Sequence, residues 1–197
     1  MKGCRYLGLA VALALLLAGC EPQQSLFPLF TDKDAFFDKQ LLGEWQIWEG
    51  TSPRPGEKSA LITFRAAVSA NTYDLTVPNF DKPGQTLFSE ARLVKLGNYI
   101  FIDLGTPNTY DSPNIPYPAL ECHVFGRLTL GKDNGRLDFL SDDWVKDKLR
   151  AGQLSLAYEE PLGIVLTASS PDLRKFALEH AEDHDAFSES FTLVRKN

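Results

Sequence analysis

Cysteine is scarce in this chain, and its scarcity limits how the folded part can be stabilised. Only three of the 197 residues are cysteines: Cys4, Cys20 and Cys122. The first two lie in or beside an apolar N-terminal run, so Cys122 is left alone in the rest of the chain. No intramolecular disulfide is therefore expected there. A chain of this length can instead be stabilised by a hydrophobic core of its own.

The sequence also lacks the patterns that mark several enzyme and nucleic-acid-binding classes. It has no Gly-rich phosphate loop, no Gly-x-Ser-x-Gly motif and no internal repeat. Basic residues are outnumbered: after residue 19 the chain carries 18 basic and 26 acidic residues, a net charge of −8. Nucleic acid would be repelled by such a surface, so we expect no nucleic-acid partner.

No apolar run is long enough to cross a membrane. The longest, residues 7–18, is uncharged and follows Lys2 and Arg5. Its twelve residues would make a helix of about 18 Å, whereas the hydrocarbon layer is about 30 Å thick. The pattern is that of a signal peptide.

The run ends in Leu17-Ala18-Gly19-Cys20, which resembles the lipobox of bacterial lipoprotein precursors. The resemblance implies that Cys20 receives a diacylglycerol and that the chain is cut before it. Residues 1–19 would then be a lipoprotein signal peptide and 20–30 a lipid anchor and tether. The alternative is an ordinary cleavable signal in which Cys20 occurs by chance. Two or three acyl chains would hold the protein stably at a cell membrane or outer membrane, facing an extracytoplasmic space.

Residues 31–197 are expected to form a single, mainly β domain, α+β by content. Short stretches rich in β-branched and aromatic residues alternate with Gly, Pro, Asn and Asp turns, which favours antiparallel pairing in one barrel or strongly curved sheet. The stretches are 45–47, 61–64, 73–77, 87–96, 99–104, 120–130, 136–140, 154–158, 163–167 and 187–194. A short helix is predicted after Thr31, and two more in the C-terminal half, starting at Ser141 and Ser170.

Gly43-Glu44-Trp45, just before the first long strand, resembles the Gly-x-Trp motif of lipocalins and related calycins. The resemblance implies a lipocalin-like barrel in which Trp45 closes one end. It also implies that a basic residue of the last strand packs across the Trp45 ring, a part that Arg195 can take. A cavity for an apolar ligand is a further implication.

The most enzyme-like feature is a pair of histidines, His180 and His184, four residues apart in a predicted helix. Such a pair shares one helix face, as the ligands of zinc metalloproteases do. The sequence marks no third ligand. The competing interpretation places His180 on an apolar stripe with Leu173 and Phe176, so that it packs at the edge of the core.

Two other features are candidates for recognition or reactivity. Residues 106–118 form a long irregular stretch in which Tyr110 and Tyr117 could contact a ligand or a protein, or simply cover one end of a barrel. Cys122 and His123 are adjacent in a predicted strand, so their side chains point to opposite faces and cannot form a nucleophile–base pair. A buried, unreactive Cys122 is the favoured interpretation.

These observations predict a membrane-anchored lipoprotein with a non-catalytic domain that binds an apolar small molecule or an envelope protein, without a cofactor. One alternative is a metal-dependent or hydrolytic envelope enzyme that uses His180 and His184. Another is a structural or assembly accessory of the cell envelope.

Overall fold

The structure is a computed structural model that describes residues 22–31, 33–53, 59–78, 84–106, 121–160 and 163–196. Its elements in chain order are β1 (Gln24–Ser25), β2 (Ala35–Phe36), the 3₁₀ turn η1 (Lys39–Leu41), β3 (Gly43–Glu49), β4 (Ala60–Ala66), β5 (Tyr73–Pro78), β6 (Thr86–Leu96), β7 (Tyr99–Gly105), β8 (His123–Leu130), β9 (Asn134–Phe139), α2 (Asp142–Arg150), β10 (Tyr158–Glu159), β11 (Val165–Leu166), α3 (Ser170–Glu179) and β12 (Glu189–Arg195).

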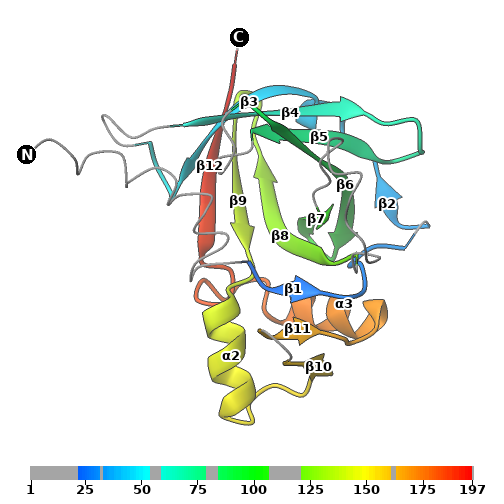
Figure 1. The fold of residues 1–197 in the computed structure, drawn as a ribbon, viewed down its shortest axis with the longest axis vertical. Helices are drawn as coiled ribbons and strands as arrows, with labels where there is room; N and C mark the ends of the chain where they lie inside the picture. Colours follow the sequence, from blue (N-terminus) through cyan, green and yellow to red (C-terminus); the bar gives the residue numbers. More distant parts are fainter. Residues whose placement is uncertain are drawn as a thin grey trace, which may run out of the picture.

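Within the described residues, eight strands close into an antiparallel, lipocalin-like barrel (Figure 1). Strands β3 to β9 pair in chain order, and β12 then fills the gap between β9 and β3. The predicted fold class is thereby confirmed, including the two C-terminal helices. Closure leaves none of these eight strands with an open edge, which removes a site of strand-to-strand aggregation.

Alternation along the strands builds the barrel core. In β3, Trp45 and Ile47 point inward, and in β12 Phe191 and Leu193 do the same. The buried residues of this core are Leu41, Trp45, Ile62, Phe64, Tyr73, Leu75, Ala91, Leu93, Ile102, Leu128, Leu137, Phe139, Phe191 and Leu193.

A second core lies on the outside of the barrel. The outward side chains of β6, β7 and β8, among them Val94, Phe101 and Phe125, are covered by α2, α3, β1 and β11. The Phe101 ring packs against Phe187 with 5.7 Å between centroids. These strands are therefore apolar on both faces, which is why periodicity alone does not reveal which face lies inside the barrel.

Both helices begin at serine caps. Ser141 accepts a hydrogen bond from the Trp144 N–H at the start of α2, and Ser169 accepts one from the Asp172 N–H at the start of α3. The α3 cap is one residue earlier than predicted, and Pro171 lies in the first turn.

The helix predicted after Thr31 is wrong. Residues Ala35–Phe36 instead pair with β6 as β2, and the only helical turn before β3 in the described residues is the three-residue η1, capped by Asp38. The Asp34 carboxylate accepts from the Thr31 N–H and closes a tight turn. That turn directs the chain into the sheet, where pairing with β6 competes successfully with helix formation.

Residues 22–30 also differ from the predicted tether. Gln24–Ser25 forms β1, which pairs antiparallel with β8 and parallel with β11. Ser25 and Leu29 are fully buried. This segment is part of the folded protein and helps to cover the outer core, so the stretch that can act as a tether is much shorter than ten residues.

Candidate functional site

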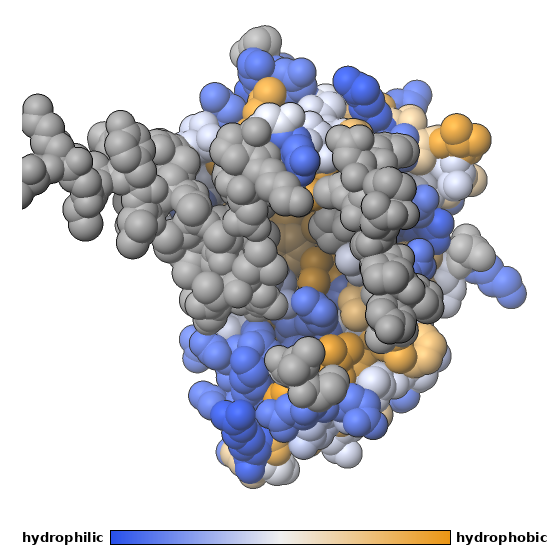
Figure 2. All heavy atoms as spheres, viewed as in Figure 1, coloured by the Kyte–Doolittle hydropathy of each residue, from blue (hydrophilic) through white to orange (hydrophobic). Residues whose placement is uncertain are grey.

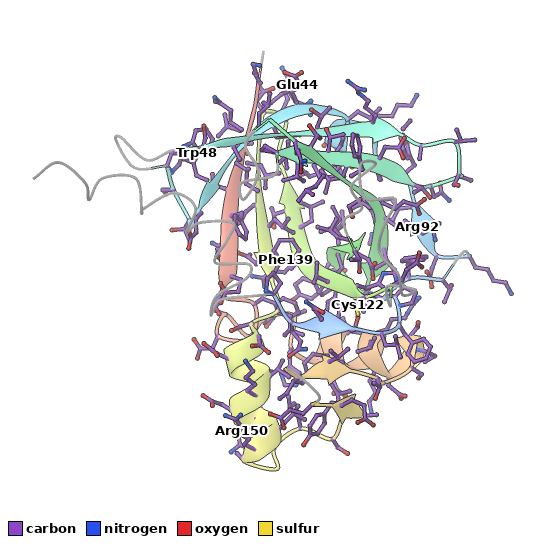
Figure 3. All side chains as sticks on the ribbon, in the orientation of Figure 1. Glu44, Trp48, Arg92, Cys122, Phe139 and Arg150 are labelled. Carbon is purple, nitrogen blue, oxygen red and sulfur yellow. The ribbon has the colours of Figure 1, made fainter. Side chains whose placement is uncertain are left out.

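The barrel is hollow at one end. A cavity of about 170 Å³ is lined by residues from all eight barrel strands, and Figure 2 shows hydrophobic side chains at the bottom of a recess on this face. Phe139 projects into it from β9 (Figure 3). The described residues that line it are Pro22, Ile47, Ala60, Ile62, Phe64, Leu75, Val77, Leu87, Ser89, Leu104, Gly105, Val124, Leu137, Phe139 and Phe191.

Ser89 is the one polar side chain in this lining, and it offers no free donor. Its hydroxyl donates to the Gly105 carbonyl at 2.6 Å, across the β6–β7 side of the wall. The cavity is therefore apolar throughout its described lining. An apolar cavity of about 150 Å³ stays dry and takes up benzene or xenon, so this one has room for a small apolar group or part of an alkyl chain.

Side-chain size explains why only one end is hollow. At the other end the interior is filled by Trp45, Tyr73 and Leu93, all fully buried. Toward the mouth, small residues such as Ala60 and Ser89 occupy inward positions and leave space between the strands.

The filled end is closed by Trp45 and Arg195. The Arg195 guanidinium lies 4.2 Å from the centroid of the Trp45 ring, and its Nη1 donates to the Leu42 carbonyl at 2.7 Å. The Trp45 Nε1–H donates to the Leu41 carbonyl at 2.8 Å. This is the contact that the Gly-x-Trp resemblance implies, and it connects the first and last strands of the barrel.

Gly43 has a specific reason to be glycine. Its φ is +117°, and a Cβ at this position would lie 3.0 Å from Arg195 Nη1. The backbone conformation therefore strains any residue with a side chain here, and the Arg195 guanidinium would also have to shift to make room for it.

The mouth of the cavity has an acidic rim. Glu49 and Glu189 occupy the last inward positions of β3 and the first of β12, directly beyond Ile47 and Phe191. Partial burial raises the pKa of the Glu189 carboxyl, and the nearby Glu49 and Asp143 carboxylates raise it further, while a hydrogen bond with Ser141 opposes the shift. Negative charge is thus concentrated at this edge of the cavity.

The raised pKa of Glu189 predicts a pH-dependent gain in stability for Glu189→Gln. A carboxyl whose pKa is higher in the folded than in the unfolded state destabilises the fold once it ionises, and has no such effect below the unfolded pKa of about 4.3. All described elements lie within 22–196, so a chain that begins at Glu21 is suitable for calorimetry. We expect the variant to raise Tm at pH 7 by about 1–3 °C and to leave it unchanged at pH 3.5.

Glu44→Gln is the matched control, because Glu44 lies at the filled end of the barrel and pairs with Lys196 at 3.1 Å. It should not raise Tm at either pH. An equal gain for Glu189→Gln at both pH values would show that its charge is not the cause.

A second, polar pocket of about 200 Å³ lies beside the cavity wall, around Asp103 and His123. Asp103 is 1% exposed; its Oδ1 lies 2.7 Å from His123 Nδ1, and its Oδ2 accepts from the Leu29 N–H at 2.6 Å. The Phe30 ring makes an edge contact with the His123 ring, and the Arg92 guanidinium lies 4.3 Å from the Phe30 centroid.

The Asp103 cluster has the form of a buried acid–histidine pair, but its partners show that it fastens residues 22–30 to the barrel. The Asp103 carboxylate contacts His123 through one oxygen and the Leu29 backbone N–H of that segment through the other. Sequence reasoning missed it, because the pairing depends on the β7–β8 register, in which Gly105 lies opposite His123. The available signal was an acidic residue in the otherwise apolar strand Tyr99–Gly105.

The two candidate metal ligands are not on one helix, contrary to the prediction. Helix α3 ends at Glu179 with His180 as its C-terminal cap, and exposed His184 follows in a turn. His180 packs at the core edge, with its ring centroid 4.9 Å from Phe176 and 5.1 Å from Trp144. No group of three His, Cys, Asp or Glu side chains in the described residues is placed to hold a metal ion.

Several other candidates lie elsewhere. Cys122 is half-buried just before β8, its backbone N–H donates to Thr106 Oγ1 at 2.8 Å, and burial raises the pKa of its thiol. Cys20, Tyr110 and Tyr117 lie outside the described residues.

Among the residues described, no helix combines the length and apolarity needed to cross a membrane.

The class that these observations define is a closed, lipocalin-like antiparallel barrel, filled at one end and hollow and apolar at the other. Searches for relatives found no matching family model, curated protein or solved structure.

Proposed function

We propose that this protein is a lipid-anchored envelope lipoprotein whose barrel binds an apolar small molecule, without catalysis. The observation that carries the proposal is the apolar cavity at the open end, about 170 Å³ in volume. The lipobox at Cys20 supports the anchored location.

The ligand that suits this cavity has an alkyl tail and a small headgroup. Each CH₂ moved from water into an apolar environment contributes about 0.8 kcal/mol, so a tail of a few carbons provides useful affinity. The lining offers no charged partner for a headgroup inside the barrel. A headgroup would therefore remain at the mouth, near Glu49 and Glu189, which disfavour a negative charge there.

Calorimetric titration with decanol, a neutral single-chain probe, tests the proposal on the chain that begins at Glu21. We expect saturable one-to-one binding with a negative ΔCp, because apolar surface is buried. Ala60→Phe should weaken binding at least tenfold, since Ala60 lines the cavity.

Ala66→Phe provides the matched control on the same strand. Ala66 is exposed at the other end of β4, beside the filled part of the barrel, so the same change there should leave decanol affinity unaltered. Absence of saturable decanol binding by the unsubstituted chain, or equal weakening by both variants, would contradict a ligand in this cavity.

A further inference from the structure

We infer that the mouth of the cavity faces the membrane that holds Cys20, and that its occupant is an acyl chain of a lipid in that bilayer. This inference rests on the proposed function. The observation behind it is that Pro22, the first described residue after the lipobox, itself lines the cavity.

The chain is fixed in place from Pro22 onward. Pro22 forms a bridge with Ser141, and the Gln23 N–H donates to the Leu140 carbonyl at 2.8 Å. The Gln23 side chain is 1% exposed and donates to the Ile164 carbonyl at 2.7 Å. Because residues 22 and 23 are fixed to the folded domain, only the residues before Pro22 can act as a flexible linker between the barrel and its anchor.

The distance from the anchor to the mouth is consequently short. Cys20 precedes Pro22 by two residues, and two residues span at most about 7 Å. The barrel strands β3 and β4 have seven residues each, so the filled end lies about 20 Å farther, measured along these strands. A lipid on Cys20 therefore places the hollow end, and not the Trp45 end, at the bilayer surface.

This placement explains how the cavity can load. An acyl chain that moved through water would expose its full length, at about 0.8 kcal/mol for each CH₂. A mouth held against the bilayer allows the chain to pass from one apolar environment to another. The rim carboxylates Glu49 and Glu189 disfavour anionic headgroups and tolerate those that carry an ammonium group.

Photocrosslinking tests the occupant. Processed, lipidated protein is reconstituted in phosphatidylcholine vesicles that contain a trace of phosphatidylcholine with a photoactivatable acyl chain. We expect crosslinks on the inward residues of β4 and β5, reduced at least fivefold in Ala60→Phe and unchanged in Ala66→Phe. Phosphatidylglycerol carrying the same acyl chain should crosslink less, because of the acidic rim.

Orientation is tested in the same vesicles with a fluorophore at either end of the barrel. In a Cys122→Ser background, Thr51→Cys places it beside the mouth and Val68→Cys beside the filled end; both positions are exposed. Spin-labelled lipid headgroups should quench the fluorophore at 51 much more than that at 68. Equal or reversed quenching overturns the inference.

The outcomes separate this inference from the proposed function. Decanol binding by the soluble chain, with no lipid crosslinks inside the barrel of the anchored protein, overturns the inference and leaves the proposed function standing. The inference is also overturned if the acyl chain attached to Cys20 itself occupies the cavity. In that case the barrel would show no crosslinks to added lipid, and the acyl chain on Cys20 would be protected from hydrolysis. Absence of decanol binding by the unsubstituted soluble chain contradicts the proposed function itself.

Discussion

Trp45→Ala is expected to lower the free energy of unfolding by about 4 kcal/mol, the usual range for removal of a large buried aromatic residue being about 3–5 kcal/mol. Trp45 is fully buried, donates to the Leu41 carbonyl and supports the Arg195 guanidinium above its ring. Removal leaves a void at the filled end and deprives Arg195 of its cation–π contact. Thermal unfolding of the chain that begins at Glu21 should show a Tm decrease of about 10 °C.

Trp48→Ala is the control for this prediction. Trp48 lies on the same strand (Figure 3), but alternation directs its side chain outward, and it is partly exposed. The same substitution there should lower the free energy of unfolding by about 1 kcal/mol. Similar losses at positions 45 and 48 would contradict a structural role for Trp45 as the plug of the barrel.

Asp103→Ala is expected to lower the free energy of unfolding by about 3 kcal/mol and to release residues 22–30 from the barrel. The buried carboxylate accepts from the Leu29 N–H and faces His123, so its loss leaves a buried donor without a partner. Hydrogen exchange of the Leu29 amide should become faster than the loss of global stability alone explains. Amides in β3 and β12 should change only by the amount that the lower free energy of global unfolding requires.

Asp74→Ala provides the comparison, since Asp74 is an exposed carboxylate on β5. We expect its Tm to change by no more than about 2 °C and the Leu29 amide to exchange as in the unsubstituted chain. If Asp103→Ala destabilises the protein without any local change at Leu29, the role assigned to the Asp103 cluster is wrong.

Much of the barrel could be predicted from the sequence because its strands carry local signals. Period-two alternation around Trp45 and Ile47, and turns such as Gly97-Asn98 between β6 and β7, were sufficient to place strands and favour antiparallel pairing. Serine caps likewise predicted α2 and α3. The contact between Trp45 and Arg195 came from the lipocalin resemblance and not from spacing, since these residues are far apart in the chain.

The features that could not be predicted depend on contacts between distant segments. Two-residue strands such as Gln24–Ser25 have no periodicity, and only pairing with β8 and β11 makes this segment extended and buried. The hollow end differs from the filled end in the combined size of the inward residues from several strands, which at the hollow end include small ones such as Ala60 and Ser89. The His180–His184 interpretation failed because α3 ends at Glu179.

Methyl NMR of the chain that begins at Glu21, recorded under xenon pressure, tests the central claim most directly. Xenon enters dry apolar cavities of this size without requiring a particular ligand chemistry. We predict saturable shifts for methyl groups that line the cavity, such as those of Ile62, Leu75 and Val77, and none for Val145 and Leu173 in the outer core. Absence of saturable shifts in the cavity methyls, or equal shifts in the outer core, would contradict a ligand cavity in this barrel.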